Sequence, residues 1–263
     1  MESISTSLQG IVQVRAIDRA SEQTIHACTR IESEVLWDSL PALRIDPAIL
    51  AQNRVVTINR STAARTPFDM MRTKILQTLR QNNWTSVAIT SPAPSCGKTF
   101  LALNLAFSLA DQKDCRTLLV DVDLRRPQIG ERLGVTGSPP FENFLNGKSD
   151  INEIFLRHDS NLAVGVNGQP VQFSAETLQS PETTRVLREL RQRMNPDVIL
   201  YDMSSMLATD DVIAFLPNVD CVILVAAAER TTLAEVDSCE QYLSEKSNVL
   251  GVVLNNCRHH RGY

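Results

Sequence analysis

The chain has 263 residues, of which 43% are hydrophobic and 21% are charged, and its formal net charge is −4. This composition is typical of a globular protein with a sizeable core, and a negative chain has no overall attraction for nucleic acid or anionic lipid. We therefore expect no nucleic-acid partner. The six cysteines include no CxxC pair, which argues against both a zinc site and a disulfide framework.

Signals for membrane insertion or export are not found in the sequence. No stretch approaches the run of about 18 uncharged apolar residues that a membrane helix requires. The first ten residues, MESISTSLQG, lack the basic start and the apolar stretch of a secretory signal. We expect a cytoplasmic protein without a transmembrane segment.

The first 65 residues differ in character from the rest of the chain. They contain short apolar groups broken by polar residues and prolines, as in LWDSLPALRIDPAIL at 36–50, without sustained strand or helix periodicity. We interpret residues 1–65 as an N-terminal extension that binds a partner. A main domain is predicted for residues 66–257, and residues 258–263 are predicted to form a flexible tail.

The main domain alternates apolar runs of strand length with amphipathic segments. Its first helix is predicted from Phe68, Ile75 and Leu79, which recur at helical spacing. The predicted helices cover residues 68–81, 99–110, 183–194 and 233–246. The predicted strands cover residues 86–90, 117–123, 161–166, 197–202, 220–228 and 248–256. Continuous apolar strands separated by helices indicate an α/β fold with a parallel sheet that is buried on both faces.

The segment SPAPSCGKTF, residues 91–100, lies between the first predicted strand and the helix that follows it. Its GKT is typical of a phosphate-binding P-loop, although the full pattern GxxxxGK[ST] would place glycine where this chain has Pro92. A chance GKT at a helix start is the alternative, and the strand-loop-helix context favours a functional loop.

Each residue of this P-loop has an expected task. Gly97 would allow close backbone approach, Lys98 would reach the β- and γ-phosphates, and Thr99 would bind Mg²⁺. The further loop residues expected to contact the nucleotide are Pro94, Ser95, Cys96 and Phe100.

Acidic residues end two other predicted strands. In LLVDVDLRRP, residues 118–127, strand alternation would point Asp121 and Asp123 to the same side, where they could hold Mg²⁺ or accept a proton from an attacking hydroxyl. Helix capping or a solvated turn is the alternative role for this pair. In DVILYD, Asp202 fits a Walker B carboxylate that holds the metal beside Thr99. The carboxyl ends of parallel strands meet at one edge of a sheet, so these motifs should lie together.

The motifs resemble those of the bacterial tyrosine kinases (BY-kinases) that regulate capsule and exopolysaccharide synthesis, which are relatives of the MinD and ParA ATPases. The resemblance covers roughly residues 67–257. The family's SPxPGEGKT followed by AxNLA is similar to SPAPSCGKT followed by LALNLA, and the Walker A′ motif DxDxR is met by Asp121, Asp123 and Arg125. The segment VLGVVLNN resembles the family's NVLGVVLNR, in which the position of Asn255 lies near the nucleotide base.

The chain departs from the family pattern in three places. The family's DxPP is replaced by DMSS after Asp202. The family's tail carries a cluster of tyrosines, whereas this tail has only Tyr263, which is our candidate phosphoacceptor. The other two tyrosines, Tyr201 and Tyr242, are predicted to pack inside the domain. An ExxRxxR motif that mediates ring assembly in some members is matched only in part, at Asp69 and Arg72.

The resemblance implies a doubly wound, mainly parallel P-loop sheet with helices on both faces and an N-terminal extension. It implies an ATP-dependent protein-tyrosine kinase, with ATP and Mg²⁺ as cofactors. It also implies a homo-oligomer, and a membrane polysaccharide co-polymerase that activates the kinase and recruits it to the inner face of the membrane. The catalytic residues would be Lys98, Asp121, Asp123 and Asp202, the metal ligands Thr99, Asp121 and Asp202, and the nucleotide contacts would include Arg125 and Asn255.

Two other functions fit parts of the sequence. A MinD/ParA-type ATPase would hydrolyse ATP without phosphorylating protein, but those proteins carry an early lysine in the P-loop, and SPAPSC contains none. A regulator that binds ATP without kinase activity would explain both the altered DxPP and the missing tyrosine cluster.

Overall fold

The computed structural model describes residues 30–58 and 62–257 of the chain. In this part of the chain a seven-stranded sheet has the order β3-β4-β2-β5-β1-β6-β7, and only the β3–β4 pair is antiparallel. Every residue of the five inner strands is buried, which explains their unbroken apolar runs. The strands are β1 (Ser86–Ser91), β2 (Thr117–Asp121), β3 (Phe155–His158), β4 (Leu162–Gly165), β5 (Val198–Ser205), β6 (Cys221–Ala227) and β7 (Asn248–Asn255).

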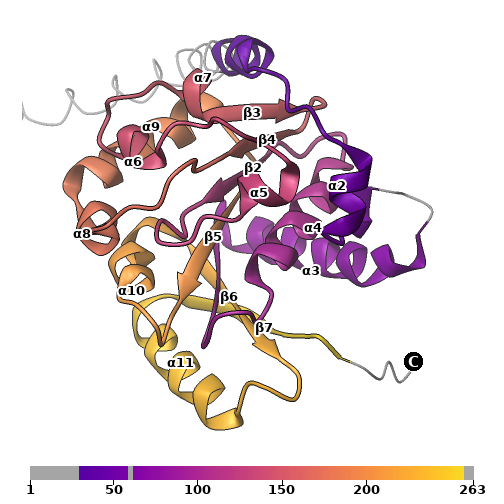
Figure 1. The fold of residues 1–263 in the computed structure, drawn as a ribbon, viewed down its shortest axis with the longest axis vertical. Coiled ribbons are helices and arrows are strands. Elements are labelled where there is room, and N and C mark those ends of the chain that lie inside the picture. Colours follow the sequence, from indigo (N-terminus) through magenta and orange to yellow (C-terminus); the bar gives the residue numbers. More distant parts are fainter. Residues whose placement is uncertain (1–29, 59–61, 258–263) are drawn as a thin grey trace, which may run out of the picture.

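Helices cover both faces of the sheet, as Figure 1 shows for α3 and α4 on one side and α6, α8 and α9 on the other. The described helices are α2 (Pro47–Gln52), α3 (Thr66–Asn82), α4 (Lys98–Ala110), α5 (Ile129–Leu133), α6 (Phe141–Leu145), α7 (Ile151–Ile154), α8 (Ser174–Gln179), α9 (Pro181–Met194), α10 (Asp211–Phe215) and α11 (Leu233–Lys246). Two buried clusters result, one on each face, so the expected α/β doubly wound architecture is confirmed. No helix among the described residues is long and apolar enough to cross a membrane.

Two strand ends differ from the predicted ones by more than one residue, and both lie at the functional edge of the sheet. β2 ends at Asp121, two residues before the predicted end, so strand alternation does not relate Asp121 to Asp123. β5 continues to Ser205, three residues beyond the prediction, because the chain carries serines rather than a proline pair after Met203. The strand β3 and the short helices α5 to α8 and α10 were not predicted.

The N-terminal segment packs on the domain over its described part. Residues 30–39 are helical, and Trp37 is only 1% exposed, with its indole Nε1 donating to the carbonyl of Met194 at 2.7 Å. Leu50 of α2 is equally buried, in the cluster on the other face. Residues 30–39 thus form a helix although residues 1–65 show no sustained helical periodicity in their sequence. A partner-binding role stays a prediction, and residues 1–29 lie outside the described part.

A single amide ties the end of this segment to α4. Asn104 is fully buried, and its Oδ1 accepts the backbone N–H groups of Val56 and Thr57 at 2.8 and 3.2 Å. Its Nδ2 donates to the carbonyls of Arg54 and Phe100 at 3.2 and 2.9 Å. Both the oxygen and the amide nitrogen of the Asn104 side chain are thus hydrogen-bonded to backbone groups. These bonds fix residues 54–57 against the helix that follows the P-loop.

Asn104→Ala should lower the free energy of unfolding by about 2–4 kcal/mol, because it leaves the N–H of Thr57 and neighbouring backbone groups without partners inside the protein. Urea denaturation of the two proteins would measure the difference. Asn82→Ala is the matched control, since Asn82 is exposed and bonds only within its own helix. Equal, small effects of the two substitutions would contradict the structural role given to Asn104.

Candidate nucleotide-binding site

The loop between β1 and α4 adopts the conformation that phosphate binding requires. Gly97 precedes the first turn of α4 with φ of 96°, in the left-handed region that favours glycine. A Cβ at this position would lie 2.0 Å from Nδ2 of Asn255, which donates to the carbonyl of Cys96 at 2.9 Å. Asn255 at the end of β7 therefore braces the loop from the side, and only glycine fits between them.

The missing first glycine of the P-loop pattern has a structural explanation. Pro92 is not among the residues with positive φ, and the left-handed turn falls at Ser95, with φ of 63°. The carbonyls of Ser91 and Pro92 accept the N–H groups of Met206 and Leu207 at 2.8 and 3.1 Å. The chain after β5 holds the loop at this point, so no glycine is required at position 92.

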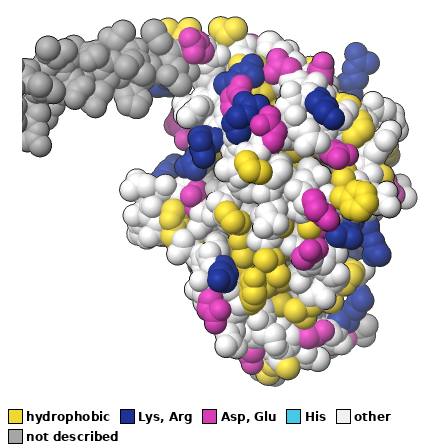
Figure 2. All heavy atoms as spheres, turned by 90° about the vertical axis from the view of Figure 1, so that its left-hand side faces the viewer, with side chains coloured by type: hydrophobic (Ala, Val, Ile, Leu, Met, Phe, Trp, Pro, Cys, Tyr) yellow, Lys and Arg dark blue, Asp and Glu magenta, His cyan; other side chains and the backbone are white. Residues whose placement is uncertain are grey.

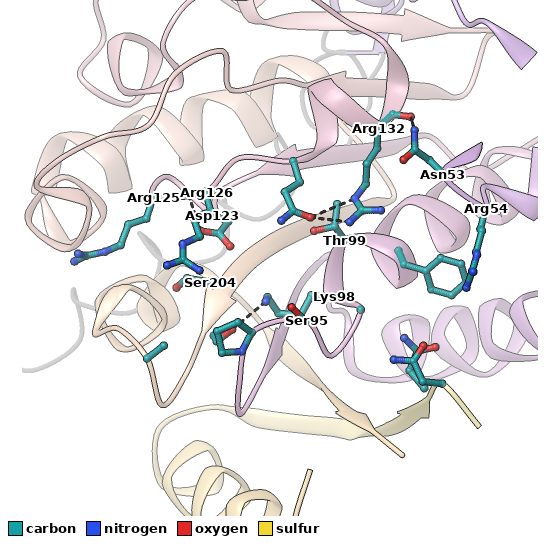
Figure 3. A pocket seen from close by; sticks show the side chains of 18 of the residues that line it. Asn53, Arg54, Ser95, Lys98, Thr99, Asp123, Arg125, Arg126, Arg132 and Ser204 are labelled. Carbon is teal, nitrogen blue, oxygen red and sulfur yellow. Dashed lines mark hydrogen bonds between the residues drawn. The ribbon is translucent and has the colours of Figure 1, made fainter. Parts of the chain in front are cut away.

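A cavity of about 680 Å³ opens above this loop, within the range typical of small-molecule sites. Five cations line it: Arg54, Lys98, Arg125, Arg126 and Arg132. Asp123 is the one carboxylate among its described lining residues. Figure 3 shows Asp123, Arg125 and Arg126 on one side of Lys98, and Arg54 on the other. Such an excess of positive charge in a chain of net charge −4 indicates a site for a polyanion.

Lys98 lies at the floor of the cavity. Its side chain is largely buried, and its Nζ donates to the hydroxyl of Ser205 at 3.1 Å. Ser205 occupies the second proline position of the family's DxPP. The serine therefore holds the ammonium group beside the loop without neutralising its charge, which leaves that charge available to a phosphate.

Two buried carboxylates lie below the cavity on neighbouring strands. Asp121 and Asp202 are register partners of β2 and β5, and both are fully buried. Oδ2 of Asp121 accepts the N–H groups of Gln128 and Ile129 at 3.0 and 2.9 Å, which fixes the start of α5. Its Oδ1 and both oxygens of Asp202 have no partner at hydrogen-bonding geometry.

Burial governs the ionisation of these carboxylates. It raises the pKa of Asp202 to about 7, against the influence of the Thr99 hydroxyl and the Lys98 ammonium group. Burial, reinforced by the charge of Asp202, also raises the pKa of Asp121 well above its ordinary range. The pKa of Asp123 is raised by burial too, and Lys98 opposes that shift.

The arrangement fits a divalent cation. The buried carboxylate oxygens of Asp202 have no hydrogen-bond partner and a raised pKa, so a bound cation would stabilise their charged form, and Asp202 lies beside the Thr99 hydroxyl. Among the described residues no cluster of three or more His, Cys, Asp or Glu could hold a metal alone. Mg²⁺ commonly takes one or two carboxylates and completes its shell with water and substrate phosphates. Asp202 and Thr99 would hold it here.

The structure brings most of the predicted site residues to the cavity. Those that line it are Pro94, Ser95, Gly97, Lys98, Thr99, Phe100, Asp123, Arg125 and Asn255. Cys96 points away, toward the hydroxyl of Thr231 at 3.6 Å, and only its backbone belongs to the loop. Asp121 and Asp202 lie beneath the lining. Arg125 is anchored at the rim by the buried Asp211, with Nε 3.2 Å from its carboxylate.

Several lining residues were not predicted. Arg126 and Arg132 were missed because arginines in loops and short helices carry no motif of their own, although LRRP placed one of them next to Arg125. Ser204 and Ser205 appeared only as a departure from DxPP. Arg54 lies in the N-terminal segment, where no local pattern signals a contact with the P-loop.

Two of the three tyrosines lie among the described residues, and both pack against the core. Tyr201 is 2% exposed and packs edge-to-face on Phe215, with ring centroids 4.9 Å apart, and Tyr242 is half-buried against the same core cluster. The prediction that both pack inside the domain is confirmed. Tyr263 lies outside the described residues.

The fold and the site together define a P-loop nucleotide-binding protein, and comparison with known proteins narrows the class. No family model matches the chain. The chain is 28% identical over 189 residues to the tyrosine-protein kinase Ptk of Acinetobacter johnsonii, covering 71% of this chain and 25% of that protein. It is 32% identical to the kinase domain of VpsO, with a TM-score of 0.65, covering 74% of this chain and 97% of that domain.

The septum site-determining protein MinD of Pyrococcus horikoshii OT3, solved with Mg-ADP, has the same fold at 20% identity and a TM-score of 0.55, covering 67% of this chain and 72% of that one. The match to the VpsO kinase domain spans nearly all of that domain, and the chain therefore belongs to the bacterial tyrosine kinase family. The chain spans about a quarter of the length of the curated relative from Acinetobacter.

Proposed function

We propose that the protein is an ATP-dependent protein-tyrosine kinase that regulates exopolysaccharide or capsule synthesis. The observation that carries the proposal is the cavity itself, in which five cations and a P-loop lie directly above the unpartnered carboxylate of Asp202. A nucleoside triphosphate bound with a divalent cation would place negative phosphates against the cavity cations and a positive ion against the Asp202 carboxylate. Family membership supplies tyrosine as the acceptor.

Each residue has a role in phosphoryl transfer. The loop N–H groups, the start of α4 and Lys98 would hold the β- and γ-phosphates. When bound by Asp202 and Thr99, Mg²⁺ would neutralise charge on the phosphate oxygens. The tyrosine oxygen forms a bond to the γ-phosphorus as the bond from that phosphorus to the β–γ bridging oxygen breaks, and ADP leaves. Asp123 accepts the phenol proton, because it is the carboxylate that lines the cavity.

A hollow beside the cavity offers an entrance for the acceptor. It has a volume of about 530 Å³ and is lined by Arg125, which it shares with the cavity, and by Leu207 and Ile213. Leu207 and Ile213 are 53% and 41% exposed, and hydrophobic side chains gather on this face of the molecule, which carries α8 and α10 (Figure 2). A tyrosine-bearing segment would reach Asp123 from this side.

A phosphotransfer experiment tests the proposed function. The full chain is incubated with MgATP, with and without the cytoplasmic segment of a polysaccharide co-polymerase, and phosphotyrosine is mapped by mass spectrometry. We expect phosphate on Tyr263, which Tyr263→Phe removes without loss of activity toward a synthetic Glu-Tyr polymer. ATP hydrolysis without phosphotyrosine in any mixture would overturn the kinase and favour an ATPase.

A regulator that binds ATP without kinase activity is the second candidate. It is favoured by the burial of Tyr201 and the packing of Tyr242, which make both of these tyrosines poor acceptors, while the third tyrosine, Tyr263, lies outside the described residues. Either a kinase or a regulator could be recruited to the membrane by a co-polymerase, so recruitment does not distinguish the two functions. The same experiment separates them, because the regulator would bind ATP without transferring or hydrolysing the γ-phosphate.

A further inference from the structure

The cavity has a wall that the P-loop motifs do not supply. Gln52, Asn53 and Arg54 line it, and all three come from the N-terminal segment, at the end of α2 and just after it. Arg54 is exposed to the cavity, and its guanidinium group forms no hydrogen bond or ion pair with any other described residue. An unpaired guanidinium group inside a ligand cavity is free to contact a ligand.

The backbone that carries Arg54 is held in an unusual conformation. Arg54 has φ of 58°, which L-residues other than glycine seldom adopt and which persists only where the surroundings enforce it. The enforcing contacts are from the N–H of Arg54 to Ala51 O at 3.1 Å, and from Asn104 Nδ2 to the carbonyl of Arg54 at 3.2 Å. Asn53 adds a bond from its Nδ2 to the carbonyl of Arg132, at 3.2 Å. The arginine is therefore positioned from both the P-loop helix and α5.

The geometry of phosphoryl transfer indicates which end of the nucleotide lies against Arg54. In an in-line displacement the attacking oxygen and the leaving group lie on opposite sides of the γ-phosphorus. Asp123 and Arg125 lie on one side of Lys98 in Figure 3, whereas Arg54 lies on the other. If the acceptor hydroxyl arrives beside Asp123, the leaving ADP and its nucleoside extend toward Arg54.

We propose that Arg54, presented by the N-terminal segment 47–57, forms the nucleoside end of the ATP site and stacks its guanidinium plane on the purine ring. The proposal rests on the proposed nucleotide-binding function and assigns part of that site to the N-terminal segment. A planar, unpaired guanidinium group suits an aromatic face, and Phe100 lines the same cavity. The N-terminal segment is then part of the ATP site.

Calorimetric titration of the full chain with MgATP, MgADP and inorganic tripolyphosphate tests this assignment. We expect Arg54→Ala to weaken binding of both nucleotides about tenfold and to leave tripolyphosphate binding unchanged. Arg54→Lys should weaken nucleotide binding similarly, because an ammonium group keeps the charge but lacks the plane. Arg44→Ala is the matched control, because Arg44 is an exposed arginine just before residues 47–57 that does not line the cavity, and this variant should bind all three probes normally.

The outcomes discriminate between roles. Unchanged ATP affinity in Arg54→Ala would overturn the proposal, and an equal loss of tripolyphosphate binding would make Arg54 a phosphate contact instead. Hydrogen exchange gives a readout without substitution, since ATP should slow exchange in residues 47–57 and tripolyphosphate should not. A protein that binds ATP but yields no phosphotyrosine would overturn only the kinase function, whereas no ATP binding by the unaltered chain would overturn both.

Discussion

Lys98→Met should lower phosphoryl transfer by a factor of at least about 100 and should weaken MgATP binding. Lys98 begins α4 and is 8% exposed, and its ammonium group is held at the cavity floor by the Ser205 hydroxyl. Methionine has a similar length and flexibility, so it keeps the packing of the side chain while removing the charge. The rate of transfer to a Glu-Tyr polymer and the affinity for MgATP would measure the two effects separately.

A matched control distinguishes this loss from a general effect of charge. Lys148→Met removes an exposed lysine that lines a different surface hollow, between α6 and α9, so it should leave transfer and binding unchanged. ATP affinity that is the same in Lys98→Met and in the unaltered chain would contradict the assignment of residues 91–100 as a P-loop.

The P-loop was predictable because its signal is local. A buried strand, a short loop and a helix follow one another in sequence, so the spacing of SPAPSCGKTF alone fixes the order of β1, loop and α4. The same holds for Asp202, which a run of buried strand residues delivers to the functional edge. The position of each strand depends on the packing of its apolar run, and these runs can be read directly from the sequence.

The N-terminal wall of the site was not predictable in this way. Trp37 is buried through a contact with Met194, which is 157 positions away, and Arg54 is held by Asn104, which is 50 positions away. Neither contact leaves a periodic pattern in residues 36–57. This segment is held in place by residues of α4 and α9, which its own composition does not reveal. Its sequence therefore looked like that of an arm not packed on the domain.

The exchange of DxPP for DMSS shows the limit of reasoning from motifs. The sequence indicates only that a rigid proline turn is lost. In the structure β5 continues through the two serines, and Ser205 accepts a hydrogen bond from Lys98. A position that looks like a defect in the motif therefore becomes a contact of the P-loop lysine, and this depends on how far β5 extends.

Asp202→Asn should have opposite effects on activity and on stability. Phosphoryl transfer should fall on the order of a hundredfold, because the amide no longer supplies the carboxylate that would hold Mg²⁺ beside Thr99. In metal-free buffer at pH 8 the variant should unfold at higher urea concentration than the unaltered chain. The buried charge of Asp202 has no hydrogen-bond partner and lies across from Asp121, so its removal relieves a cost.

The pH dependence of stability follows from the direction of the pKa shift. Burial raises the pKa of Asp202 to about 7 in the folded protein, from the ordinary value of 3.8. Between these values the folded state binds more protons than the unfolded state, so the free energy of unfolding falls as the pH rises from about 4 to about 7. Asp202→Asn should flatten this slope, and it should also reduce the repulsion that raises the pKa of Asp121.

Urea denaturation in EDTA at several pH values would measure the slope. Asp237→Asn is the control, since Asp237 is exposed on α11, and its profile should follow that of the unaltered chain. A destabilised Asp202→Asn at pH 8 would mean that the carboxylate has a stabilising partner in the metal-free protein. If the variant is instead more stable but inactive, the charge of Asp202 destabilises the metal-free fold and is needed to bind the cation.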